Sequence, residues 1–478
     1  MAMGQMKATS ATPPKEKIDR QILKVALILI FGAVASQLDS TMINVAIDTL
    51  AFDLHSTVAT IQWVITGYVL TMGLAVPISG WAINRFGGKR VYMFSLWIFL
   101  GSSVLCSFAW NTGSLIGFRL LQGVGAGLLI PTMQNVLVQS AGGRGLGRLI
   151  AIISIPALLG PILGPVIGGL IMDNLSWRWI FYVNIPITLV ALWLSWRHIP
   201  TDAPPKGKQT LDIAGLLLLS PAFAALIYGI SEISTHGGLN SAGVWVPLAG
   251  GVILMAGYIV YALRTSRTPL VDLHLFKSRH FLASNMTLFL AGMVMNGALL
   301  LLPLYYQQVR GETVLATGLL LIPQGVGMLL TRSWIGKLSD RMSARTIVTV
   351  SLAVTAVATI PFAFAEAATS HLLLGAAQLV RGAALNGLLI PIMVSAYAGL
   401  KKEQVPHASI STRIFQTIGG AFGSAVLATV VSHQLANSSA ASLQAVAESY
   451  QAAFWWSIGF TVAAFIPALL LSGSKKPS

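Results

Sequence analysis

The chain alternates long apolar segments with short polar ones along almost its whole length. Each apolar segment has about 20 residues, the length that a helix needs to cross a hydrocarbon layer of about 30 Å. The pattern therefore predicts an all-helical membrane protein with fourteen spans. Their approximate limits are residues 22–46, 58–81, 90–109, 113–138, 149–172, 178–197, 211–231, 243–263, 281–305, 314–335, 345–366, 371–397, 410–433 and 450–472.

The composition agrees with this reading. Of the 478 residues, 55% are hydrophobic and 9% are charged, and the mean hydropathy is +0.75. Soluble proteins have about a quarter of charged residues, so the soluble classes are excluded. The single cysteine, Cys106, excludes an intramolecular disulfide, and we expect a buried structural thiol there.

The position of the basic residues predicts the orientation in the membrane. A net charge of +15 would suggest a nucleic-acid partner in a soluble protein, but here the charges lie between the spans. With the N-terminus inside, the cytoplasmic loops and ends contain nearly all Lys and Arg, Arg413 included, and the opposite loops hold only Arg178 and Arg310. We therefore expect a multi-pass protein of the cell membrane with both termini cytoplasmic. Polar residues 1–20 predict a disordered cytoplasmic tail and not a signal peptide, and residues 473–478 a second tail.

Two sequence echoes indicate an internal duplication. GWAINRFGGKR at 80–90 returns in degraded form as GKLSDRMSAR at 336–345, and GLLIPTM at 127–133 returns as GLLIPIM at 387–393. The two offsets, 336 − 80 = 256 and 387 − 127 = 260, are nearly equal. This spacing predicts two six-helix bundles, at 21–199 and 268–472, with an inserted pair of spans at 200–267.

The stretch GPILGPVIGG at 160–169 is unusual inside a predicted span. Glycine costs about 1 kcal/mol and proline about 3 kcal/mol relative to alanine in a helix interior. Gly160, Gly164 and Gly168 share one helix face and allow a neighbouring backbone to come close, whereas Pro161 and Pro165 weaken the hydrogen-bond ladder. The stretch predicts a close and movable helix contact, and a static packing face is the alternative.

Asp39 is the strongest candidate for proton binding. It lies roughly 24 Å from the cytoplasmic end of the first span, at 1.5 Å per residue, and therefore in the outer half of the membrane. A carboxyl at such depth is costly and by default functional, and a low dielectric disfavours its charged form. We expect Asp39 to bind and release a proton near neutral pH. The alternative is a structural carboxylate bonded to the hydroxyl of Thr41 or Ser36.

Two arginines lie inside predicted spans. Arg119 in the fourth span stays charged and must find an acceptor, so it could tune the proton affinity of Asp39. A fixed brace on backbone carbonyls is the other interpretation. Arg381 in the twelfth span has nearly the corresponding position in the second half, and we expect it to act in gating or in anion recognition.

Polar and aromatic side chains within the spans could line a substrate cavity. Interhelical hydrogen bonding explains such residues equally well one by one, but as a set they are typical of an adaptable pocket. The candidates are Gln62, Trp63, Tyr68, Gln134, Asn135, Asn296, Tyr305, Gln324, Arg381, Asn386 and Gln416.

Several of these motifs together resemble the major facilitator superfamily. GPILGPVIGG matches its antiporter signature GxxxGPxxGG at Gly160, Gly164, Pro165, Gly168 and Gly169. QLDSTMINVAI (37–47), SWRWIFYVNIPIT (176–188) and PLVDLHLFKSRHF (269–281) are similar to segments of its fourteen-span drug/proton antiporters. The resemblance implies two six-helix bundles with an inserted pair, a coupling proton on Asp39, and an intramembrane arginine at Arg119.

The loop at 80–90 resembles the cytoplasmic loop of the superfamily, but with one departure. It matches at Gly80, Arg85, Gly87, Lys89 and Arg90. The family pattern has Asp where this chain has Asn84, and that acid is implicated in latching the two halves. Asp340 in the second-half echo could replace it, and Lys89 and Arg90 also fit a simple positive-inside anchor.

No motif for ATP hydrolysis, metal-dependent hydrolysis or nucleophilic catalysis is present. We therefore expect no enzyme, no cofactor and no metal, but a monomeric secondary transporter that exports hydrophobic, drug-like compounds in exchange for protons. Its expected partners are small lipophilic substrates, protons and membrane lipids. Neutral or singly cationic lipophiles should be preferred, and the field of Arg119 and Arg381 could also admit weak acids. A lipid or metabolite exporter of the same fold and a membrane sensor that moves nothing are the alternatives.

Overall fold

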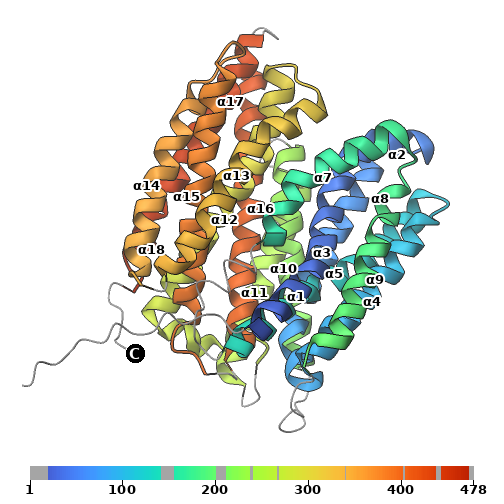
Figure 1. The fold of residues 1–478 in the computed structure, drawn as a ribbon, viewed down its shortest axis with the longest axis vertical. Helices are drawn as coiled ribbons and strands as arrows, with labels where there is room; N and C mark the ends of the chain where they lie inside the picture. Colours follow the sequence, from blue (N-terminus) through green and yellow to red (C-terminus); the bar gives the residue numbers. More distant parts are fainter. Residues whose placement is uncertain are drawn as a thin grey trace, which may run out of the picture.

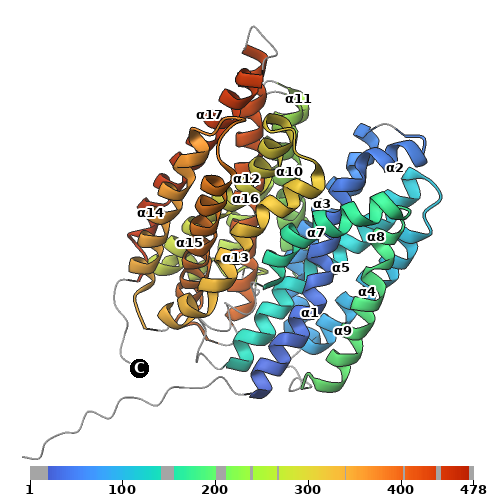
Figure 2. The same ribbon diagram turned by 45° about the horizontal axis from the view of Figure 1, so that its top comes forward.

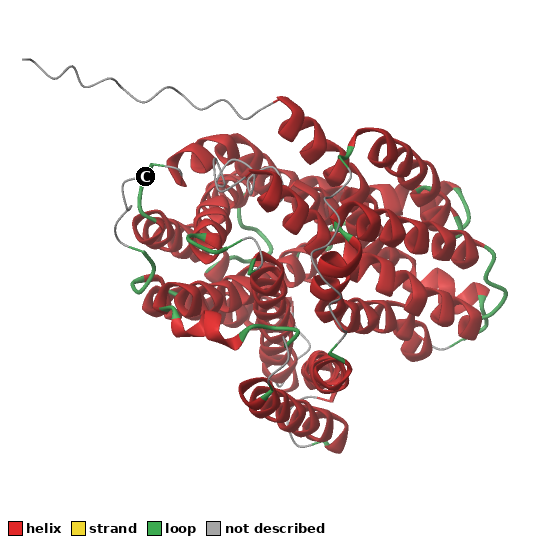
Figure 3. Ribbon diagram, turned by 90° about the horizontal axis from the view of Figure 1, so that it is seen from below, coloured by secondary structure: helices red, strands yellow, loops and turns green. Residues whose placement is uncertain are grey.

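The computed structural model describes residues 20–56, 58–141, 155–200, 212–236, 241–265, 269–339, 341–401, 404–437 and 443–472. This part of the chain consists of helices and loops without any strand (Figures 1 and 3). The helices are α1 (Arg20–Met42), α2 (Ile47–Asp53), α3 (Val58–Phe86), α4 (Gly88–Ser107), α5 (Thr112–Ala141), α7 (Ile155–Asn174), α8 (Trp179–Tyr182), α9 (Asn184–His198), α10 (Ile213–His236), α11 (Ala242–Arg264), α12 (Arg279–Leu304), α13 (Val314–Ser339), α14 (Ala344–Ala363), α15 (His371–Tyr397), α16 (Val405–Asn437), α17 (Leu443–Ala463) and α18 (Phe465–Ala468), with short η1 (Ile43–Ala46), η2 (Leu273–Lys277) and a π-helical turn η3 (Tyr305–Val309).

A helix lies at each predicted span, and α8 with α9 occupies the sixth position. Among the described residues, twelve helices are long and apolar enough to cross a membrane. Helices α7 and α13 are not among those twelve, so the count of fourteen spans stays a prediction. Residues 1–19 and 473–478, where we expect the tails, lie outside the described residues, as do the loop at 201–211 and Asp340.

The helix contacts repeat between the two parts of the chain, as the sequence echoes predict. In the first part α1 packs against α7 and α9, α3 against α5, and α4 against α5 and α9. In the second part α12 packs against α16 and α17, α13 against α15, and α14 against α15 and α17. Position by position, α12 therefore corresponds to α1, α13 to α3, α15 to α5 and α16 to α7. We call these parts the first and the second half.

The two halves meet through five helices (Figures 1 and 2). Helix α7 packs against α13, and α16 packs against α3 and α5. A Cβ on Gly80 of α3 would come within 2.6 Å of Ile410 of α16, so the glycine permits a close approach. The Ser409 hydroxyl of α16 donates a hydrogen bond to Gln134 Oε1 of α5 at 3.3 Å. Helix α16 therefore contacts two helices of the first half, and α7 contacts one helix of the second.

Helix α10 of the inserted pair lies against both halves. It packs on α3 and on α16, while α11 packs mainly on α10. The ring of Phe223 fills the space beside Gly73 of α3, and the Ser220 hydroxyl donates to the carbonyl oxygen of Leu74 at 3.0 Å. The inserted pair is therefore joined to the seam between the halves. The domain limits that the sequence predicts stay a prediction.

Candidate functional site

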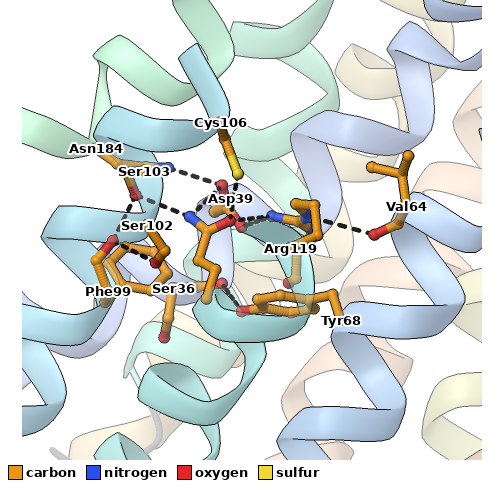
Figure 4. A network of polar contacts seen from close by, with 12 residues as sticks. Ser36, Asp39, Val64, Tyr68, Phe99, Ser102, Ser103, Cys106, Arg119 and Asn184 are labelled. Atoms are coloured by element: carbon orange, nitrogen blue, oxygen red, sulfur yellow. Dashed lines mark hydrogen bonds and ion pairs between the residues drawn. The ribbon is translucent and has the colours of Figure 1, made fainter. Parts of the chain in front are cut away.

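Asp39 lies in a closed network of hydrogen bonds inside the first half (Figure 4). Its side chain is 0% exposed. Oδ2 accepts from Arg119 Nη1 at 2.5 Å, and Oδ1 accepts from Asn184 Nδ2 at 2.7 Å and from Gln122 Nε2 at 3.3 Å. Three donors from α5 and α9 thus meet at one carboxylate of α1. The structure brings together the two ionisable residues that the sequence singles out.

Arg119 is held from three further directions. Its Nε donates to the carbonyl oxygen of Val64 on α3 at 3.2 Å, and its Nη1 also donates to Gln122 Oε1 at 2.7 Å. The guanidinium carbon lies 4.1 Å from the ring centre of Tyr68, a cation–π distance. Arg119 is therefore both the ion partner of Asp39 and a link between α1 and α3.

Two amide residues of this network, Gln122 and Asn184, are absent from the sequence prediction. Gln122 also donates to Ser103 of α4 at 2.8 Å, and the Cys106 thiol lies 3.8 Å from Gln122 Oε1. Asn184 lies in the SWRWIFYVNIPIT segment, and the resemblance of this segment to the drug/proton antiporters is the sequence signal that could have indicated it. Amides in membrane helices so often bond only to neighbouring helices that composition alone could not select these two.

Neither of the alternative partners, Ser36 and Thr41, bonds to Asp39 through its hydroxyl. The Ser36 hydroxyl donates to the carbonyl oxygen of Ala33 at 3.0 Å, within its own helix. The Thr41 hydroxyl lies 2.8 Å from the carbonyl oxygen of Gly160 on α7 and near carbonyls of α1. Asp39 is instead tied to other helices.

The glycines of α7 face α1 directly. A Cβ on Gly160 would lie 2.7 Å from the carbonyl oxygen of Gln37, one on Gly164 would lie 1.9 Å from Thr41 Oγ1, and one on Gly168 would lie 3.1 Å from the carbonyl oxygen of Met42. A Cβ on Gly169 would meet nothing within 4 Å. The three glycines four residues apart therefore make the close contact with α1. The side chains of Pro161 and Pro165 lie outside the described part of the structure.

The loop motif connects helices of the first half, and its Gly80 contacts the second half. Lys89 Nζ donates to the carbonyl oxygens of Trp196 at 3.0 Å and Ile199 at 2.5 Å, at the end of α9. Gly87 has φ +88°, which favours glycine between α3 and α4. Asn84 and Arg85 are half-buried, and Arg90 is exposed. Lys89 thus holds two helices of one half together.

The predicted cavity residues of the first half have separate surroundings. Tyr68 belongs to the Arg119 site, and its hydroxyl donates to the carbonyl oxygen of Ser36 at 3.3 Å. Trp63 is 42% exposed and stacks on Tyr228 of α10 at 5.7 Å between ring centres. Gln134 bonds to Ser409, and buried Asn135 accepts from Gln139 at 3.0 Å. The Gln62 side chain lies outside the described part.

The predicted cavity residues of the second half include several interhelical bonds. Asn386 of α15 donates to the Met328 carbonyl and to Thr331 on α13, and Arg381 donates to Gln324 Oε1 at 3.1 Å. Exposed Asn296 donates to its own helix, and Gln416 is half-buried. Tyr305 donates to the Glu366 carbonyl at 2.9 Å, in a cluster at the far end of α12. Their role in one shared cavity stays a prediction.

Arg413 lies inside α16, although the sequence groups it with the cytoplasmic loops and ends. The predicted span begins at 410, whereas α16 begins at Val405, so Arg413 lies about two turns from the start of this helix. Its side chain is half-buried. Its place on the cytoplasmic side stays a prediction.

No set of three His, Cys, Asp or Glu in the described ranges could hold a metal ion. A pocket of about 300 Å³ lies at the junction of η2 with the loop before α16, near His274 and His280, and none of the predicted cavity residues lines it. The charged groups that the structure brings together at the candidate site are Asp39 and Arg119.

Comparison with known proteins decides the family. The model of the Major Facilitator Superfamily matches residues 29–424. The chain belongs to the major facilitator superfamily. It is 34% identical over 88% of its length to 78% of the Multidrug resistance protein B homolog of Mycobacterium tuberculosis H37Rv, and 31% identical over 85% of its length to 79% of the Multidrug export protein EmrB of Haemophilus influenzae. The human organic anion transporter MFSD10 (TETRAN) has the same fold, with a TM-score of 0.63 at 15% identity, over 96% of this chain and all of the other.

Membership of the major facilitator superfamily confirms the predicted fold class. The chain is a transporter and not an enzyme, and it is a multi-pass protein of the plasma membrane. Carriers of this kind are built from two repeated bundles, which explains why the helix contacts of the first half recur in the second.

Proposed function

We propose that this major facilitator protein exports hydrophobic, drug-like compounds and that the inward movement of protons drives the export. The names of the relatives, a multidrug resistance protein and a multidrug export protein, support the substrate class. The buried Asp39 network supports the proton coupling. The name of the second relative, an export protein, supports the direction of transport.

The main support for proton coupling is that Asp39 accepts hydrogen bonds from three donors and is buried from solvent. A deprotonated carboxylate satisfies Arg119, Gln122 and Asn184 at once. A protonated carboxyl has one oxygen that donates and a weaker acceptor, so the charge on Arg119 loses its partner. Proton binding therefore favours a different arrangement of α1, α5 and α9, in which Arg119 finds another acceptor.

The network also reaches the glycine contact. Thr41 follows Asp39 by two residues on α1 and bonds to Gly160 of α7. A change in the position of α1 at Asp39 is therefore transmitted within one helical turn to the closest contact between α1 and α7. Because α7 packs on α13, the movement reaches the second half.

The driving force is sufficient. One proton that crosses a potential of about 150 mV releases roughly 3.5 kcal/mol, at about 2.3 kcal/mol per 100 mV. This energy supports a gradient of about 300-fold for a neutral substrate.

Asp39→Asn tests the proposal in proteoliposomes with an imposed pH gradient. We expect substrate efflux and the coupled pH signal to be lost while folding is retained, since the amide cannot carry the proton. The matched control is Asp53→Asn, because Asp53 is exposed at the end of α2. Coupling at the wild-type level in Asp39→Asn would remove Asp39 from the mechanism. Substrate counterflow without a gradient separates a carrier from a membrane sensor, which would show none.

A further inference from the structure

The second half repeats the arginine site of the first half. Arg119 of α5 donates to Val64 on α3, and Arg381 of α15 donates to Gln324 on α13, the helix that corresponds to α3. Gln324 follows Val64 by 324 − 64 = 260 residues, the offset of the GLLIPTM echo. Arg381 follows Arg119 by 381 − 119 = 262 residues, two more than this offset, so the two guanidinium groups bond to corresponding helices but differ slightly in register.

The carboxylate of the first site has no counterpart in the second. On α12, which corresponds to α1, Arg381 Nη2 donates to the backbone carbonyl of Val294 at 3.2 Å. Arg381 is 2% exposed, its Nε has no hydrogen-bond partner, and it forms no ion pair with a carboxylate in the described ranges. The second half thus holds a buried cation whose charge is not compensated, where the first half holds an ion pair.

Such a group needs an anion. Arginine stays protonated, so Arg381 cannot avoid the cost of burial by releasing its proton, and an unpaired buried charge costs several kcal/mol. Only two of its five N–H groups are bonded in the described structure. The Nε–H has no partner, so this side of the guanidinium can donate to a carboxylate.

The side chains around Arg381 indicate the kind of ligand that carries this anion. Helices α12, α13 and α15 contribute mainly to apolar clusters, while half-buried Gln324 connects Arg381 with accessible surface. We propose that Arg381, with Gln324 beside it, binds the negatively charged group of an amphipathic substrate. This inference rests on the proposed export of drug-like compounds and names one class of them.

Equilibrium binding to the purified full chain in non-ionic detergent tests the inference without any gradient. The probes are N-dansyl-8-aminooctanoate and its primary amide, which differ only in the charge of one end group, at pH 8 where the acid is ionised. We expect the wild-type protein to bind the carboxylate at least tenfold more tightly than the amide. Arg381→Gln should bring the ratio of the two Kd values close to one, and Arg381→Lys should keep part of the preference.

Two controls make the result specific. Arg310→Gln removes a cation bonded to the Thr369 carbonyl at the far end of α12 and should leave the preference unchanged. Arg413→Gln should reduce the preference less than Arg381→Gln. An equal affinity for both probes in the wild type, or a preference that survives in folded Arg381→Gln, overturns the inference. The Asp39→Asn experiment is independent, so proton-coupled export can stand if this preference fails, and the reverse.

Discussion

The hydroxyl of Thr41 donates a hydrogen bond to the carbonyl oxygen of Gly160 at 2.8 Å and joins α1 to α7 two residues beyond Asp39. The bond is possible only because α7 carries no side chain at the contact. Gly164 faces the same hydroxyl, so one threonine occupies the space that two glycines leave. The antiporter motif of α7 therefore contacts α1 beside the candidate proton site.

Thr41→Val keeps the shape of the side chain and removes this bond. We expect a loss of about 1 kcal/mol in the free energy of unfolding and slower coupled efflux, because a typical hydrogen bond contributes about that much. Thermal unfolding in detergent and efflux from proteoliposomes measure the two effects. Thr349→Val is the control, since the Thr349 hydroxyl bonds only to carbonyls of its own helix α14. Equal effects of both substitutions would contradict a special role for the bond to Gly160.

Gly164→Leu should block transport while the protein still inserts, because four added heavy atoms would separate α1 from α7. Gly164→Ala should be milder, but it should still impair transport, as its Cβ would lie 1.9 Å from Thr41 Oγ1. Gly169→Ala, in the same motif, should behave as wild type because nothing lies within 4 Å. Normal efflux by purified Gly164→Leu would mean that the close contact plays no part in transport.

Asn184→Ala should slow coupled efflux and lower the free energy of unfolding by about 1.5–3 kcal/mol. Asn184 donates to Asp39 Oδ1 at 2.7 Å, and a hydrogen bond to a charged group contributes about that much. Efflux from proteoliposomes and thermal unfolding in detergent measure the two effects. Asn174→Ala, at an exposed position at the end of α7, is the control and should behave as wild type. Efflux at the wild-type rate in Asn184→Ala would refute the role of this amide.

Compounds with two positive charges should be exported poorly. The carboxylate of Asp39 is already paired with Arg119, and Arg381 adds unpaired positive charge, so a dication would lie in the protein interior without a free acid. Export rates of matched mono- and bis-quaternary compounds of similar hydrophobicity measure the difference. Comparable rates would show that a carboxylate near the end of a span reaches the substrate.

The sequence predicts a site residue when that residue is costly in a membrane. It does not predict one whose role depends on its hydrogen-bond partners. Asp39, Arg119 and the glycine face could be predicted, because each is expensive in an apolar helix unless it has a use. Gln122 and Asn184 could not, since an amide looks the same whether it bonds to a carboxylate or to a neighbouring helix. The sequence places the start of the thirteenth span at 410, whereas α16 begins five residues earlier at Val405, and this difference changes the position of Arg413 in the helix. Helix ends are the least certain part of a sequence prediction.

The position of α10 has a consequence for the route of a membrane-dissolved compound. Helix α10 packs on both α3 and α16, and its Phe223 and Ser220 contact Gly73 and Leu74 of α3, so the inserted pair covers the seam between the halves on this side. The two halves therefore do not have equal surroundings in the bilayer. An amphiphile that diffuses in the plane of the membrane meets α10 before it reaches the seam between α3 and α16.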